Sequence, residues 1–105
     1  PRQISMANRW GIPREVEQEV LARDTVCVYC GVAFSSERKF KPSWEHIIND
    51  ITIATTDNIA LCCVGCNASK GTKLLSDWLN SPNAKKRGIS QETLSPTILK
   101  ALNNS

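Results

Sequence analysis

The segment Cys63-Val64-Gly65-Cys66-Asn67 contains a Cys-x-x-Cys pair that repeats the spacing of Cys27-Val28-Tyr29-Cys30. A tight turn can aim both sulfurs of such a pair at one ion, and two pairs supply the four ligands of a tetrahedral zinc site. The chain has five cysteines, an odd number that fits poorly with a complete disulfide framework. The sequence therefore predicts one structural zinc ion with the following ligands: Cys27, Cys30, Cys63 and Cys66.

Three neighbouring residues carry further expectations. Gly31 and Gly65 suit turns in which backbone amides face the sulfurs and a positive φ can be needed. Cys62 is expected to be a small buried hydrophobic residue. The alternative, in which Cys62 replaces Cys63 as a zinc ligand, matches the spacing of the first pair less well.

The interval between the two pairs is 32 residues long and holds the only histidine, His46, directly after Glu45. Imidazole accepts a proton near neutral pH, so His46 suits the activation of water in phosphodiester hydrolysis. Glu45 and Asn67 are oxygen donors of the kind that Mg²⁺ or a similar hard ion prefers. Successive residues of a strand point to opposite faces, so Glu45 and His46 can share a site only near a strand end, a bulge or an edge.

Size and charge set limits on these interpretations. A chain of 105 residues forms one small domain, which often needs a metal to supplement its core. Four thiolates and one zinc ion lower the formal charge of +3 to about +1, so net charge is a weak argument for nucleic acid. Local basic residues on both sides of the candidate site are better candidates for phosphate contact: Arg38, Lys39, Lys41, Lys70 and Lys73. The run 85–87 fits a solvated face and a DNA contact equally well.

Patterning predicts a small α+β domain with an arm over 1–12, a core over 13–80 and a C-terminal helical extension over 81–105. Pro13 and the apolar residues Val16, Val20 and Leu21 predict a first helix. The other expected elements are a connection over 32–41, a strand over 43–48, extended pieces at 51, 53 and 59–61, and helices over 64–70, 73–80, 82–87 and 96–102. The three tryptophans are expected in the core. No apolar stretch is long enough to span a membrane, no signal peptide is visible, and Pro1 is not an initiator residue.

The ordered motifs resemble the zinc-knuckle branch of the HNH endonucleases, which have the ββα-metal (His-Me finger) fold. The resemblance covers roughly residues 13 to 80 and rests on Cys27-x2-Cys30, Glu45-His46-Ile47, Asn58-Ile59-Ala60-Leu61 and Cys63-x2-Cys66-Asn67-x2-Lys70-Gly71. It implies that His46 is the general base, that Asn58 braces the loop around the histidine, and that Asn67 is a metal ligand on the helix. Glu45 stands where most members have aspartate, and residues 49–57 lack the glycine pair common in the hairpin connection.

The expected function is therefore a metal-dependent endonuclease that hydrolyses DNA, with structural Zn²⁺ and catalytic Mg²⁺ or Mn²⁺. We expect the protein in the cytoplasm of a bacterial or phage-infected cell. Its expected partner is DNA, and no association with a membrane is expected. One alternative is a zinc-stabilised nucleic-acid-binding module that has lost the chemistry. Another, a zinc-ribbon interaction domain, leaves Glu45, His46 and Asn67 unexplained.

Overall fold

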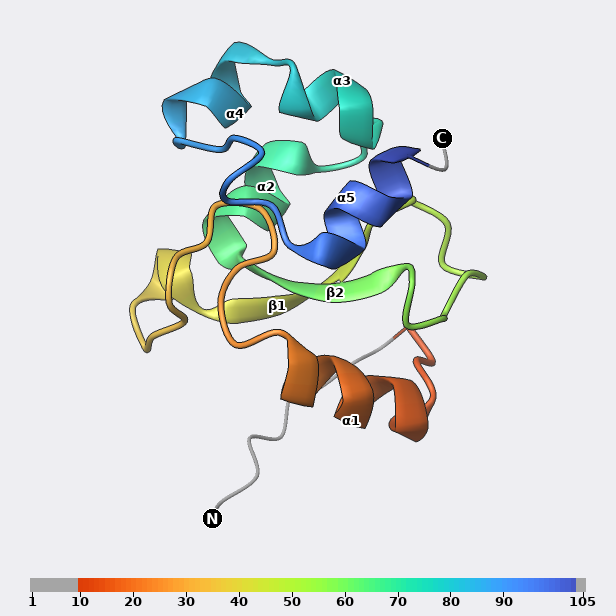
Figure 1. Ribbon diagram of the computed structural model, residues 1–105. Coiled ribbons are helices and arrows are strands. Elements are labelled where there is room, and N and C mark those ends of the chain that lie inside the picture. Colours follow the sequence, from red (N-terminus) through yellow and green to blue (C-terminus); the bar gives the residue numbers. More distant parts are fainter. Residues whose placement is uncertain (1–9, 104–105) are drawn as a thin grey trace.

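The structure is a computed structural model in which residues 10–103 are described, so most of the expected arm over 1–12 lies outside the described residues. Its centre is an antiparallel hairpin that lies between a single helix on one face and several helices on the other (Figure 1). Strand β1 (Pro42–His46) pairs with β2 (Ile59–Cys63), so that Pro42 is opposite Cys63 and His46 is opposite Ile59. The domain is thus a small α+β structure, as expected.

Helix α1 (Arg14–Arg23) covers one face of the hairpin. Pro13 precedes the helix, and two glutamates in its first turn complement the positive end of the helix dipole. Val20 is fully buried against Trp44, Ile59 and Leu61, which point from alternate positions of the two strands. The predicted apolar stripe of this helix is confirmed.

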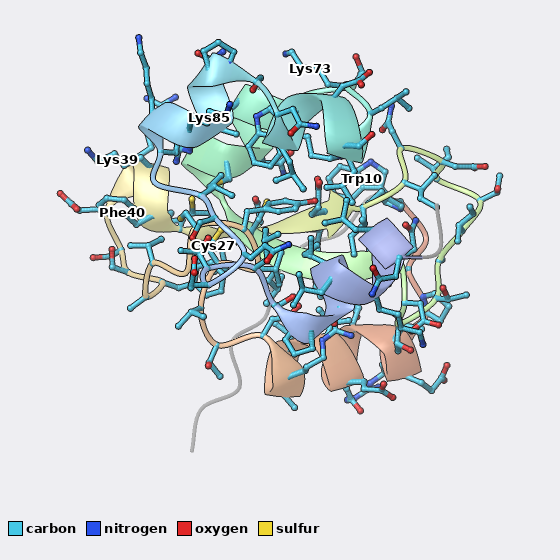
Figure 2. The ribbon with its side chains drawn as sticks, turned by 45° about the horizontal axis from the view of Figure 1, so that its top comes forward. Trp10, Cys27, Lys39, Phe40, Lys73 and Lys85 are labelled. Atoms are coloured by element: carbon cyan, nitrogen blue, oxygen red, sulfur yellow. The ribbon has the colours of Figure 1, made fainter. Side chains whose placement is uncertain are left out.

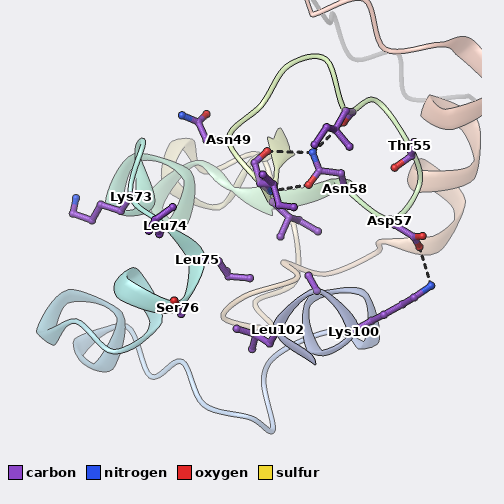
Figure 3. A pocket seen from close by; sticks show the side chains of 14 residues that line it. Asn49, Thr55, Asp57, Asn58, Lys73, Leu74, Leu75, Ser76, Lys100 and Leu102 are labelled. Carbon is purple, nitrogen blue, oxygen red and sulfur yellow. Dashed lines mark hydrogen bonds and ion pairs between the residues drawn. The ribbon is translucent and has the colours of Figure 1, made fainter. Parts of the chain in front are cut away.

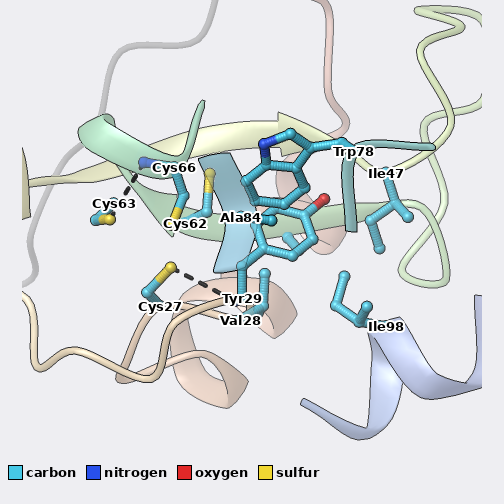
Figure 4. Packing of buried hydrophobic residues seen from close by; sticks show 11 residues of the cluster. Cys27, Val28, Tyr29, Ile47, Cys62, Cys63, Cys66, Trp78, Ala84 and Ile98 are labelled. Atoms are coloured by element: carbon cyan, nitrogen blue, oxygen red, sulfur yellow. Dashed lines mark hydrogen bonds between the residues drawn. The ribbon is translucent and has the colours of Figure 1, made fainter. Parts of the chain in front are cut away.

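The opposite face carries α2 (Val64–Lys70), α3 (Leu75–Leu79), α4 (Pro82–Lys86) and α5 (Pro96–Asn103). Trp78 of α3 is fully buried and meets the Tyr29 ring edge-on, with ring centroids 4.9 Å apart (Figure 4). Ala84 and Ile98, from α4 and α5, are fully buried in the same cluster. The segment after residue 80 is therefore part of the domain core and not an appendage to it.

The helices follow the sequence expectations more closely than the loop after β1 does. Helix α2 begins and ends where predicted, and Gly71 ends it with φ 53°. Residues 51 and 53 form no strand; instead Asp50 accepts hydrogen bonds from the amide and hydroxyl of Thr52, and Ile51 is exposed. The connection over 32–41 contains a short 3₁₀ helix, η1 (Arg38–Phe40). Within residues 10–103, no helix is long and apolar enough to cross a membrane.

An ion pair between a buried aspartate and a partly exposed arginine, which no local sequence pattern signals, attaches the end of α1 to the hairpin. Asp24 is buried and accepts hydrogen bonds from Nε and Nη2 of Arg23, at 2.8 and 2.9 Å, and from the Leu61 amide at 3.0 Å. Arg23 also donates to the carbonyls of Thr56 and Ile59, each at 2.8 Å. One arginine and one aspartate thus fix the position of α1 relative to the end of the loop before β2 and to β2 itself.

Replacing Asp24 with alanine should destabilise the domain, because the Leu61 amide and the Arg23 guanidinium would lose their buried acceptor. We expect a loss of about 1–3 kcal/mol in the free energy of unfolding. The measurement is urea denaturation of the zinc-loaded protein. The control Asp77→Ala, at an exposed carboxylate of α3, should change stability by about 0.5 kcal/mol or less; equal losses in the two variants would contradict this role of Asp24.

Candidate functional site

The two cysteine pairs converge at the start of α2. The Sγ atoms of Cys27, Cys30, Cys63 and Cys66 all lie within 4.8 Å of one another, and those of Cys30 and Cys63 are 3.8 Å apart. Four sulfurs at ~2.3 Å from one zinc ion in a tetrahedron are ~3.8 Å from each other. The donor set and its spacing therefore fit zinc, and four cysteine ligands leave no open coordination position.

Backbone amides surround the sulfurs, as the turn geometry predicted. The amides of Tyr29 and Cys30 donate to Cys27 Sγ at 3.4 and 3.5 Å, and the amide of Cys66 donates to Cys63 Sγ at 3.4 Å. Cys63 is both the last residue of β2 and the N-cap of α2. A metal at this point would therefore fix the end of the hairpin and the start of the helix together.

The glycines of the two knuckles have different roles. Gly31 has φ 76°, the left-handed conformation that favours glycine. Gly65 lies in a turn whose next amide faces Cys63 Sγ, as expected, but it does so without a positive φ; a side chain there would overlap the guanidinium of Arg87. Cys62 is fully buried beside Ser43 and outside the four-sulfur cluster, which confirms that it is a core residue and not a ligand.

The crowded sulfurs also need a cation for electrostatic reasons. A hydrogen bond between Cys27 and Cys66 lowers the pKa of Cys27 to about 5, and the same bond raises the pKa of Cys66. Negative charges placed this close repel one another, and a metal ion bound between the sulfurs would compensate them.

His46 lies at the end of β1, on the face that carries α1. It is 9% exposed, and its Nε2 is buried without a hydrogen-bond partner among the described residues. Trp10 meets the imidazole edge-on, with ring centroids 6.1 Å apart (labelled in Figure 2). Burial lowers the pKa of His46, with Lys70 acting in the same direction and Asp50 opposing it. A neutral imidazole with an uncommitted nitrogen can accept a proton.

The position of Trp10 differs from expectation. Trp44 and Trp78 are buried, but Trp10 is 38% exposed and lies beside His46 instead of in the core. No periodic pattern surrounds Trp10 in the sequence, so nothing there distinguishes a core position from one beside the histidine.

Asn58 holds the loop between the two strands. Its Oδ1 accepts from the Ile48 amide at 2.7 Å, and its Nδ2 donates to the carbonyls of Ile48 and Ile53 at 3.1 and 3.0 Å. The Asn58 carbonyl accepts from the Ile47 amide at 2.9 Å. These bonds immediately follow His46 and are the ones that a bracing role requires.

Asn67 projects from α2 toward β1. Its Nδ2 donates to Ser43 Oγ at 3.0 Å and to the Trp44 carbonyl at 3.1 Å. Among the described residues, no hydrogen bond engages its Oδ1. The amide thus ties the helix to the strand and leaves an oxygen available to a cation.

Glu45 and Lys70 form a buried ion pair on the opposite face from His46. The Lys70 ammonium is 3.1 Å from Oε2 of Glu45, and the side chains are 1% and 6% exposed. Tyr29 Oη donates to the same oxygen at 2.6 Å. Lys70, predicted to contact phosphate, is therefore enclosed and paired, and Glu45, predicted to bind the cation, already has two partners on one oxygen.

The other predicted phosphate contacts lie at the surface. Arg38, Lys39 and Lys41 are exposed on and beside η1, and Lys73 is exposed after α2. Lys39 and Lys85 lie at the same end of the molecule as Cys27, although they come from η1 and α4 (Figure 2). Positive side chains from separate elements therefore border the zinc end of the domain.

A groove of about 370 Å³ lies between the loop after β1, α3 and α5 (Figure 3). Ile48, Leu74 and Leu102 contribute apolar walls, and Lys73 and Lys100 stand at its edge. Lys100 is 3.3 Å from Asp57. Asn58 borders this groove but His46 does not, so the groove is separate from the histidine.

Comparisons with protein-family models, with curated proteins and with solved structures find no match to this chain. The arrangement of the chain's own side chains is therefore the basis for assigning a function.

Zinc removal should unfold the domain, because a domain of this size gains a large part of its folding free energy from the metal that joins its two knuckles. Elemental analysis of protein prepared with zinc should give one tightly bound ion per chain, and a strong chelator should abolish the native circular dichroism spectrum. Cys63→Ser should lose zinc, whereas Cys62→Ala should keep it. Retention of zinc by Cys63→Ser with loss from Cys62→Ala would reverse the ligand assignment.

Removing the charge of Lys70 should lower the free energy of unfolding of the domain. Lys70→Ala leaves the Glu45 carboxylate buried without its ion partner, a change that costs about 3–5 kcal/mol. Lys73→Ala is the matched control, since Lys73 is an exposed lysine next to the same helix. Urea denaturation at saturating zinc gives both values; a Lys70→Ala variant as stable as Lys73→Ala would show that the pair carries no structural role.

Proposed function

We propose that this protein is a metal-dependent endonuclease that hydrolyses DNA phosphodiester bonds, with the ββα-metal fold of the HNH enzymes. The observation that carries the proposal is His46. Its buried Nε2 has no described partner, at the end of a strand whose loop Asn58 braces and whose neighbouring strand ends in the four-cysteine cluster. A buried polar atom without a partner costs free energy, and a catalytic role is one explanation for keeping it.

His46 would act as the general base. Burial keeps the imidazole neutral at lower pH than usual, so it can take a proton from a water molecule that attacks the phosphorus. Trp10 lies beside the ring and restricts its position. The hydrogen bonds of Asn58 fix the backbone directly after His46, which limits the movement of the base during the reaction.

The residues offer a partial fit to a catalytic Mg²⁺ or Mn²⁺ ion. Among the described residues, no hydrogen bond engages Oε1 of Glu45 or Oδ1 of Asn67, and both are oxygens of the type that hard ions bind. Such an ion would supply positive charge at the phosphate. Glu45 points to the face of the hairpin opposite His46, so the ion and the base would share one phosphate only around the end of β1, where His46 is the last residue of the strand. Because the Lys70 ammonium already neutralises Glu45, an added cation would compete with it for the carboxylate.

DNA binding would use the exposed basic residues. Arg38, Lys39, Lys41 and Lys73 can reach backbone phosphates, and such contacts make affinity fall as salt rises. Lys70 would not contact phosphate directly, since its ammonium is enclosed; it would act by holding the Glu45 carboxylate in place. The proposed location remains the cytoplasm of a bacterial or phage-infected cell.

A second candidate is a nucleic-acid-binding module without catalytic activity. The observation in its favour is that Oε2 of Glu45 is engaged by both Lys70 and Tyr29. If that pair persists in the presence of metal, the cation has only Asn67 as a protein ligand. The zinc centre and the basic surface would then serve binding alone.

His46→Ala should abolish cleavage of supercoiled plasmid in Mg²⁺ or Mn²⁺ and leave zinc content and DNA affinity near wild type. The base acts in the transition state, and loss of a general base typically lowers the rate about 10²–10⁴-fold. Asn49→Ala, exposed in the same loop, is the control and should cleave normally.

The outcomes separate the two candidates. Cutting by His46→Ala at the wild-type rate would remove His46 from the mechanism. DNA binding by the wild-type protein without any cutting in either metal would favour the binding module. Full activity after chelation of all but the structural zinc would show that no second ion takes part.

A further inference from the structure

Arg87 lies against the zinc cluster although it comes from outside both cysteine pairs. It directly follows α4, and its Nε donates to Cys66 Sγ at 3.3 Å and its Nη2 to Cys63 Sγ at 3.6 Å. Lys85 and Lys86, the other members of the same basic run, are exposed. The run 85–87 therefore divides into two surface lysines and one half-buried arginine with defined sulfur partners.

The backbone of α2 makes room for this guanidinium. An added Cβ at Gly65 would overlap Nη2 of Arg87 and lie 3.1 Å from its Cζ. Gly65 has no positive φ, so the backbone conformation does not require glycine there. A side chain at this position would therefore have to displace the guanidinium of Arg87.

A zinc ion with four thiolates carries a net charge of about −2. A cation that hydrogen-bonds to two of the sulfurs reduces this charge locally and holds both ligands in position. Groups of this kind around a metal orient the ligands and slow exchange of the ion. Arginine suits the task because its planar fork can address two acceptors at once.

We propose that Arg87 is a positioning residue of the zinc centre, which holds Cys63 and Cys66 in place and slows the loss of zinc. It couples the segment after α4 to the start of α2, the helix that also carries Asn67. The proposal does not depend on the nuclease function, because zinc retention can be measured without DNA.

The first experiment measures the rate of zinc transfer from the folded protein to a chromophoric chelator. Arg87→Gln should release zinc about 10-fold faster or more. Gly65→Ala should do the same with Arg87 still present, because the new methyl displaces the flexible guanidinium and leaves the four cysteines in place. Lys86→Ala removes the same charge from an exposed neighbour and should release zinc at the wild-type rate.

A second measurement distinguishes contact with the sulfurs from general stability. In the Co²⁺-substituted protein, the thiolate-to-metal charge-transfer band reports hydrogen bonding to the sulfurs. This band should move to lower energy in Arg87→Gln and Gly65→Ala. In Arg87→Lys, which keeps a positive charge, the shift from the wild-type band should be smaller. Lys86→Ala should leave the band unchanged.

Wild-type release rates and an unshifted band in both Arg87→Gln and Gly65→Ala would overturn the proposal. Faster release in Lys86→Ala, equal to that in Arg87→Gln, would overturn it too, because general charge would then explain the effect. If Arg87→Gln does not fold, Gly65→Ala alone decides, since its guanidinium and all four sulfurs remain.

Discussion

The convergence of four sulfurs from two distant turns is the constraint on which the domain depends. The first turn follows α1, and the second joins β2 to α2, so one ion at their meeting point would fix three elements at once. The hairpin itself has only two short strands, which are marginal alone. With its strands anchored at the zinc end, the opposite end can hold the loop that carries Asn58 and follows His46.

Two ion pairs with buried carboxylates complement this anchor, one for each face of the hairpin. Arg23 and Asp24 attach the end of α1 to β2, and Lys70 attaches the end of α2 to Glu45 of β1. In each pair the carboxylate is buried; the Lys70 cation is buried with Glu45, whereas Arg23 keeps part of its guanidinium exposed, so only the Lys70 pair leaves a buried charge whichever partner is lost. His46 directly follows Glu45, whose bonds in this structure are structural. A catalytic cation that binds Glu45 would have to compete with Lys70 for the carboxylate.

The sequence predicted those features that local spacing or periodicity encodes. The cysteine spacing identified the four-sulfur cluster, and the turn signal at Gly71 located the end of α2. Alternation along β1 left open whether Glu45 and His46 share a face, and in the structure they point to opposite faces of the hairpin. Partners distant along the chain were not predictable: nothing near Lys70 distinguishes a buried ion pair from a phosphate contact, and nothing near Arg87 indicates a sulfur partner. The extended pieces expected at 51 and 53 failed because the hydrogen bonds of Asp50 and Asn58 stabilise a turn there.

The backbone of the first knuckle is completed from the far end of the chain. The Ser95 amide donates to the Val28 carbonyl at 2.9 Å, and Ile98 is fully buried among the residues of that knuckle. Contacts between segments so far apart close a long loop, which costs chain entropy before it gains stability and slows folding. On the ribosome, where synthesis proceeds from the N-terminus, the first pair of cysteines therefore emerges well before the residues that enclose it. The thiols of the first pair stay uncovered on the nascent chain until α5 has been made.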